Sequence, residues 1–179
     1  ITEDRDNFDY IVDINDFYNL RGTSYRNARR KLRLFSGLTL RCSSVTLTLM
    51  SRNEHERVIK VYNSVVGSKV NEEEFRALKR LICIRNETVL YVLFLQINGK
   101  DEAFIIIESN RGVLNALFWK ANIEFKGIYV YVMWLLCARL RGSSFEEINI
   151  QEDMGVSGLR QFKISISEKT LKKYTLYAK

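Results

Sequence analysis

The stretch VLYVLFLQINGKDEAFIIIE, residues 89–108, decides the fold of this chain. Its two runs rich in Val, Ile, Phe and Tyr, residues 89–97 and 102–108, have the composition typical of buried strands. Between them lies Asn98-Gly99-Lys100, and Asn and Gly readily adopt the left-handed backbone that a tight hairpin turn requires. The stretch therefore predicts an antiparallel β-hairpin.

The chain after the hairpin predicts more strands and one buried helix. Residues 114–121 predict a further strand. Residues 127–141 are apolar on nearly every side, as is typical of a helix packed between other layers, and Gly142 ends it. A short strand over 145–150, a helical turn over 158–162 and a final strand over 173–178 complete this half.

The chain before the hairpin predicts three helices and one extended segment. Apolar residues recur at helical spacing in residues 24–35, 54–66 and 72–85, and Asn71 is a plausible N-cap of the third helix. Residues 38–50, rich in Leu, Val and Thr, predict extended chain. Helices that precede an antiparallel sheet, which one buried helix then covers, indicate the α+β class.

The bulk composition bounds the class of protein. A chain of 179 residues with 46% apolar residues can fill one core, so we expect one domain. We expect no membrane span and no signal peptide, because the longest apolar run is too short. Three widely spaced cysteines and one histidine match no zinc spacing, so we expect no metal site and a reduced, cytoplasmic compartment.

Charge is distributed unevenly along the chain. Residues 1–20 carry six acids and one base, whereas residues 21–41 carry seven bases and no acid. On the helix predicted over 24–35 one face carries four arginines: Arg26, Arg29, Arg30 and Arg33. These could bind a phosphate array of tRNA or of an anionic lipid surface, in line with the net charge of +7. Pairing with the acids immediately upstream is an equally good interpretation.

Three further stretches carry a resemblance to a known protein family. The first comprises Phe8-Asp9-Tyr10-Ile11, Leu20-Arg21-Gly22 and the run from Tyr25 to Leu32. The second is Lys120-Ala121-Asn122 with Gly127-Ile128-Tyr129. The third is the run INIQEDMGVSGLRQFK, residues 148–163, closed by Lys173-Tyr174. In order and spacing they resemble the C-terminal half of the phosphatidylglycerol lysyltransferase family over residues 8–176.

The resemblance implies a GNAT-like fold, the acyl-CoA N-acyltransferase-like architecture, as the C-terminal lobe of a tandem. It also implies kinship with enzymes that transfer an aminoacyl group from charged tRNA to lipid or peptide. We therefore expect an acidic N-terminal segment over 1–23 and a GNAT-like domain over 24–179. The implied partners are an N-terminal GNAT-like lobe or a second copy of the chain.

Candidate site residues lie mainly near the C-terminus. Glu152 and Asp153 follow a predicted strand, and either could act as a general base, although such residues also commonly cap loops. Arg160 and Lys163 share one face of the helical turn and suit an anionic phosphate, although a solvated basic face is the simpler alternative. Lys120 and Asn122 complete the proposed substrate-binding set.

The donor of the transferred group is open to two classes. A coenzyme A site normally shows a glycine-rich loop between strand and helix, and residues 122–127 contain one glycine. This favours aminoacyl-tRNA over acyl-CoA. The first hypothesis is an acyltransferase-like domain that transfers an aminoacyl or acyl group to a lipid, peptide or small amine, in the cytoplasm and peripheral to the membrane's inner face. The second is a catalytically silent module that binds a polyanion or partner protein through its basic helix.

Overall fold

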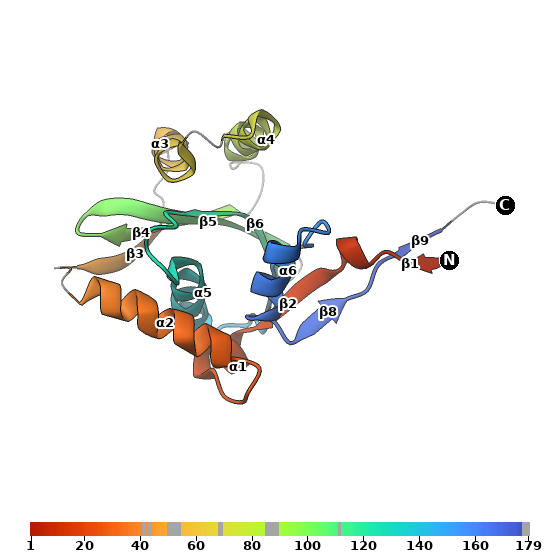
Figure 1. The fold of residues 1–179 in the computed structure, drawn as a ribbon. Helices are drawn as coiled ribbons and strands as arrows, with labels where there is room; N and C mark the ends of the chain where they lie inside the picture. Colours follow the sequence, from red (N-terminus) through yellow and green to blue (C-terminus); the bar gives the residue numbers. More distant parts are fainter. Residues whose placement is uncertain are drawn as a thin grey trace.

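The computed structural model describes residues 1–40, 42, 44–49, 55–67, 70–84, 90–110 and 112–176. A seven-stranded sheet forms the middle layer; α3 and α4 cover one face, and α1, α2 and α5 lie on the other (Figure 1). This confirms the predicted α+β class. A separate two-stranded ribbon, β1 (Thr2–Glu3) with β9 (Tyr174–Thr175), projects from the body and carries both ends of the described chain.

The strand order of the main sheet is β3-β4-β5-β6-β7-β2-β8. The strands are β3 (Val45–Leu49), β4 (Leu90–Ile97), β5 (Lys100–Asn110), β6 (Val113–Ala121), β7 (Glu147–Asn149), β2 (Asp9–Asp13) and β8 (Lys169–Leu171). All neighbours are antiparallel except β6 and β7, which are parallel. The mostly antiparallel sheet thus contains one parallel pair near its middle.

The predicted hairpin is confirmed as β4 and β5. Asn98 and Gly99 have φ angles of 53° and 78°, the left-handed backbone that a two-residue hairpin turn needs. Along β4 and β5, successive side chains point alternately to the two faces of the sheet and so enter two different hydrophobic cores. Leu93 and Ile105 face the α5 side, whereas Phe94 and Phe104 face α3 and α4. Both faces of this hairpin are therefore buried, which explains its nearly continuous apolar sequence.

Helices cover both faces of the sheet. On one face lie α3 (His55–Val66) and α4 (Glu72–Cys83), the second capped by Asn71, whose side chain accepts the backbone N–H groups of Glu73 and Glu74. On the other lie α1 (Ile14–Asn19), α2 (Arg26–Thr39) and the buried α5 (Ile128–Leu140). A last helix, α6 (Ser157–Ile164), follows β7.

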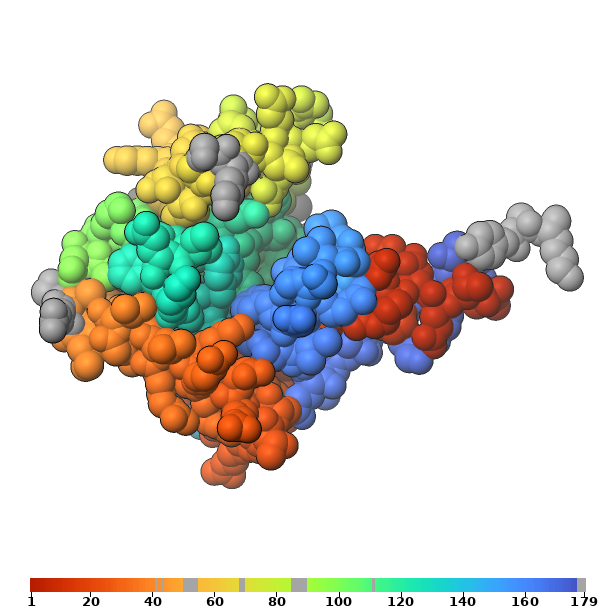
Figure 2. All heavy atoms as spheres, in the orientation of Figure 1, coloured from red at the N-terminus to blue at the C-terminus, as the bar shows by residue number. Residues whose placement is uncertain are grey.

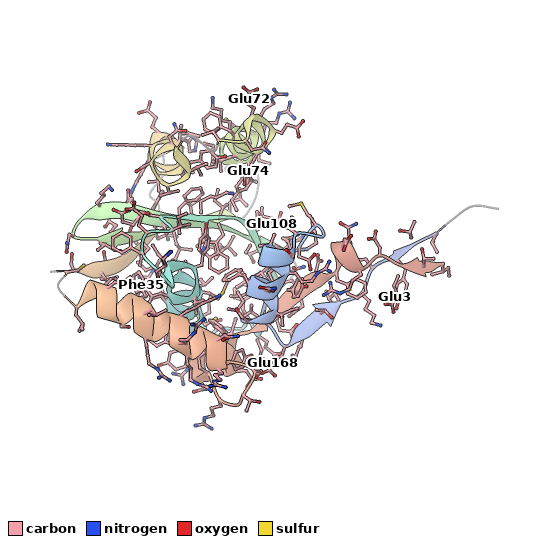
Figure 3. The ribbon with its side chains drawn as sticks, viewed as in Figure 1. Glu3, Phe35, Glu72, Glu74, Glu108 and Glu168 are labelled. Atoms are coloured by element: carbon pink, nitrogen blue, oxygen red, sulfur yellow. The ribbon has the colours of Figure 1, made fainter. Side chains whose placement is uncertain are left out.

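Helices α2 and α5 cross in close contact. Phe35 reaches from α2 towards α5 (Figure 3), and its ring stacks on Tyr131 with centroids 4.3 Å apart. At the start of α5, Gly127 has φ 91°, and a Cβ atom there would lie 2.1 Å from the carbonyl oxygen of Lys31. Only glycine permits this approach of the two backbones.

Three sequence predictions need correction. Within the predicted extended segment 38–50, α2 continues to Thr39 and β3 occupies only Val45–Leu49, while positions 41, 43 and 50 lie outside the described residues. The predicted strand 173–178 is the two-residue β9, with 177 and 178 likewise outside, and β8 precedes it unpredicted.

The third correction concerns residues 1–23, which do not form a segment apart from the domain. Residues 5–7 form a short 3-10 helix, and β2 lies between β7 and β8 within the sheet, with Tyr10 and Val12 fully buried. The acidic residues of this stretch suggested a separate segment, but the apolar residues between them are buried in the domain core.

Candidate functional site

A cleft opens where the parallel strands β6 and β7 diverge. They pair only at Leu114 with Ile148 and at Asn115 with Asn149; beyond this β6 continues, while the chain after β7 turns into a loop and α6. The cleft between them has a volume of about 650 Å³. Its walls are residues 116–120 of β6, the loop residues 150–152 and 154, Glu74 of α4, Tyr129 of α5, and four residues of α6, at 158, 159, 162 and 163.

Aromatic side chains form one wall of the cleft. Trp119, Tyr129 and Phe162 contact one another edge to face, with ring centroids 5.3 to 5.8 Å apart. The Tyr129 hydroxyl accepts the backbone N–H of Ala121, whereas the indole Nε1 of Trp119 is buried and has no partner among the described residues. This wall suits the apolar part of an acyl group.

Asp153 is fully buried beneath the cleft and hydrogen-bonded on both oxygens. Arg160 donates to both of them at 2.9 Å, the Tyr10 hydroxyl donates to Oδ2 at 2.5 Å, and Arg5 lies 3.4 Å away. The backbone N–H of Gly155 donates to Oδ1. The hydrogen bond from Arg160 holds the Asp153 pKa well below its ordinary value. The geometry favours a structural role for Asp153 over that of a general base.

Arg160 and Lys163 of α6 are both engaged inside the protein. The guanidinium of Arg160 bridges Asp153 and Asp6, the latter at 2.6 Å. The ammonium of Lys163 is buried and donates to the backbone carbonyls of Ile150, Gln151 and Glu152 at 2.5 to 3.0 Å. Burial lowers the pKa of Lys163 to about 8. Lys163 lines the cleft, but both cations hold the loop after β7 rather than stand free for a phosphate.

Glu152 is the loop carboxylate that the cleft leaves accessible. Its side chain is 30% exposed and lines the cleft, and its nearest cation is Lys173, 3.8 Å away. Glu152 is thus partly exposed to solvent, whereas its neighbour Asp153 points into the protein and is buried. Of the two predicted general bases, Glu152 alone reaches the cleft.

Lys120 and Asn122 are placed differently. Lys120 lines the cleft and pairs with Glu74 of α4 at 2.5 Å, and the other oxygen of Glu74 accepts the Tyr62 hydroxyl at 3.1 Å. Figure 3 shows Glu74 on the side of α4 that faces the sheet. Asn122 bonds to Glu102 and to the backbone of Glu124, outside the cleft. Sequence reasoning missed Glu74, and no local signal marks it because α4 is brought to β6 only by folding.

The predicted arginine face lies on α2 and does not line the cleft. Arg29 donates to the backbone carbonyls of Leu20 and Gly22 and so ties the turn before α2 to the helix. Arg26, Arg30 and Arg33 are exposed.

The pairing with upstream acids, which the sequence left open for this face, does not occur among the described ion pairs. Five of the six acids have other partners: Glu3 with Lys172, Asp4 with Asn7, Asp6 with Arg160, Asp9 with Lys173 and Asp13 with Lys169. No ion pair joins Asp16 to α2, and its backbone N–H donates to Asp13.

Solved structures share this fold. A conserved protein of unknown function from Bacteroides thetaiotaomicron VPI-5482 superposes with a TM-score of 0.78 at 23% identity, covering 96% of this chain and 59% of that one. L-PGS from Bacillus licheniformis gives 0.57 at 15% identity, covering 89% of this chain and 56% of that one. The chain therefore spans less than two thirds of these proteins, and the likeness concerns the fold.

A third solved structure also shares the fold. It is a C-terminal domain from Agrobacterium fabrum whose description assigns it to a lysylphosphatidylglycerol synthetase, and it gives a TM-score of 0.61 at 15% identity, covering 93% of this chain and 58% of that one. No curated protein sequence matches the chain significantly.

The sheet, its diverging parallel pair and the cleft between them give this domain the GNAT-like fold. The family model described as "Phosphatidylglycerol lysyltransferase, C-terminal" matches residues 1–177. The chain therefore belongs to that family, as the resemblance of its motifs predicted. No described helix has the length and hydropathy needed to cross a membrane.

Proposed function

We propose that this domain transfers an aminoacyl or acyl group to an acceptor bound beside the cleft, with Glu152 as general base. The observation that carries the proposal is the cleft itself, which combines an aromatic wall with the partly exposed carboxylate of Glu152. The other carboxylate that lines the cleft, Glu74, is held by Lys120 at 2.5 Å, whereas Glu152 lies 3.8 Å from Lys173. Transfer to an amine or hydroxyl requires removal of a proton from the nucleophile, and a partly exposed carboxylate can accept it. Family membership supports this class of reaction.

The surroundings of α5 favour aminoacyl-tRNA over a coenzyme A thioester as donor. A pyrophosphate would bind best at the N-terminus of the helix that follows β6, where N–H groups and the helix dipole attract anions. At that point the carbonyl oxygen of Lys31 lies against Gly127 and presents partial negative charge. This close approach leaves no room for a phosphate on the side of Gly127 where a Cβ atom would lie.

The acceptor belongs to the same proposal. The family's name describes lysyl transfer to phosphatidylglycerol, which makes a lipid hydroxyl the first acceptor to test, followed by a peptide or small amine. Because the solved relatives are longer than this chain, a second GNAT-like lobe could contribute to the substrate site. We propose a cytoplasmic location for this reaction, where charged tRNA is found.

The test compares wild type with Glu152→Gln for transfer from charged tRNA and from an acyl-CoA to phosphatidylglycerol and to small amines. Loss of a general base should lower the rate by about 10²- to 10⁴-fold while the melting temperature stays unchanged. Glu73→Gln is the matched control, because Glu73 is an exposed carboxylate of α4 outside the cleft. A Glu152→Gln rate within twofold of wild type would rule out Glu152 as the base.

A second function, a catalytically silent module that binds a polyanion or a partner protein through α2, has one observation in its favour. Arg26, Arg30 and Arg33 are exposed, and no ion pair involves them in the part of the chain that the structure describes. Absence of transfer with every donor, together with retained α2-dependent binding, would favour this function over the first.

A further inference from the structure

Helix α2 presents an outward face that combines free cations with exposed leucines. Arg26, Arg30 and Arg33 follow one another at helical spacing, and none of their guanidinium groups has a hydrogen bond or ion pair among the described residues. Beside them Leu34 is 48% exposed, Leu38 is 49% exposed and Leu40, which caps the helix, is 83% exposed. We call these six residues the α2 face.

The α2 face is held in place by the opposite side of the helix. Ala28 and Phe35 are fully buried, and Phe35 stacks on Tyr131 of α5. The helix therefore cannot turn to hide its leucines. In Figure 2, α2 runs along the outer surface with no other element over it in that view.

Charge restricts the partner to an anion. No acidic residue occurs between residues 21 and 41, and five of the six acids upstream have partners away from α2. Three unpaired guanidinium groups therefore favour a surface rich in phosphate.

The leucines decide between two phosphate-bearing partners. An RNA backbone pairs with arginines but gains little from three exposed leucines, whereas the interfacial region of a bilayer accommodates both side-chain types. Arg30, Leu34 and Leu38 are spaced four residues apart and so lie along one line of the helix, where a single flat surface can touch all three.

We propose that the α2 face docks the protein reversibly on a bilayer containing anionic phospholipid, with α2 parallel to the membrane plane. Each arginine close to such a surface strengthens binding roughly fivefold, so the three together contribute on the order of 100-fold at low salt. The leucines add a component that salt does not screen. The inference does not depend on the chemistry of the cleft.

The experiment is co-sedimentation of the whole protein with vesicles of phosphatidylcholine alone or mixed with phosphatidylglycerol, at low and physiological salt. The triple variant R26E/R30E/R33E should lose at least 100-fold of its affinity for the mixed vesicles. The control R76E/K79E/R80E changes the same charge on exposed positions of α4, and it should lose much less. Equal loss in both variants would reduce the effect to net charge and overturn the proposal.

A second variant, L34S/L38S, tests the leucines while keeping every charge. It should weaken vesicle binding at physiological salt several-fold and leave binding to a transfer RNA unchanged. Loss of RNA binding in the arginine variant with intact vesicle binding would assign the face to nucleic acid instead. Conversion of a dimer to a monomer by L34S/L38S, without effect on vesicles, would assign it to a second copy of the chain.

Discussion

Glu152 and Asp153 are neighbours in the chain and have different environments in the fold. Asp153 lies among Arg160, Tyr10 and Gly155, and its carboxylate has no oxygen left for a substrate. Glu152 lies on the rim of the cleft, and among the described residues its carboxylate pairs only with Lys173, at 3.8 Å. At this scale the alternation of side chains and the partners they meet separate a structural acid from a candidate base.

The pKa of Asp153 leads to a prediction about acid stability. Because its folded-state pKa is lowered, the unfolded chain binds a proton at higher pH than the folded protein does, so the stabilisation is present above the ordinary carboxyl pKa of about 4 and is lost as pH falls below it. Asp153→Asn should cost about 3 kcal/mol at pH 7, since it leaves Arg160 without its buried partner.

Denaturant unfolding of both proteins at neutral pH and near pH 3 checks this. The difference between wild type and Asp153→Asn should shrink in acid, because the unfolded wild-type chain takes up a proton on Asp153 near pH 3 while the folded protein does not, and the variant has no carboxyl group to protonate there. A difference that is the same at both pH values would show that the carboxylate's charge does not contribute to stability.

At the scale of elements, the contact of α2 with the start of α5 determines how the layer below the sheet packs. Two glycines of this layer have opposite roles. Gly127 has a positive φ and lies against the backbone of Lys31, whereas Gly37 lies within α2 with nothing within 4 Å of an added Cβ.

Gly127→Ala should therefore destabilise the protein by about 3 kcal/mol or more, because both the backbone conformation and the added methyl group are unfavourable. Gly37→Ala is the matched control and should stabilise it by about 0.5–1 kcal/mol, since alanine favours helix. Thermal unfolding of the two variants measures both effects. An unchanged melting temperature for Gly127→Ala would mean that α2 and α5 separate easily.

At the scale of the whole molecule, an N-terminal strand lies between two strands from the C-terminal part of the chain. Strand β2 pairs with β7 on one side and β8 on the other, and Arg5 and Tyr10 contribute to the bonds around Asp153. The N-terminal residues thus support the loop after β7, and this loop lines the cleft.

Removal of residues 1–13 should abolish cooperative unfolding, because it takes away β2 and two fully buried side chains, Tyr10 and Val12. Removal of residues 1–3 is the control: it costs β1 and one exposed ion pair, and should shift the melting temperature by less than about 4 °C. Circular dichroism during heating distinguishes them. A sharp transition in the larger truncation would show that β2 is dispensable.

Local patterns in the sequence were sufficient for the β4–β5 hairpin, the buried helix α5, the N-cap Asn71 and the family motifs. Alternation, helical spacing, turn chemistry and capping act between residues close in the chain, so they can be recognised without the fold. The same reasoning identified Glu152 and Lys120, both of which line the cleft.

Tertiary structure alone decided which charged side chains have partners within the protein and which are exposed without one among the described residues. The pairing of Lys120 with Glu74, the enclosure of Lys163 by three carbonyls and the freedom of the α2 arginines depend on residues far apart in sequence. Whether an ionisable side chain serves chemistry or structure depends on the groups around it and on its access to water, and folding brings those together from the whole chain.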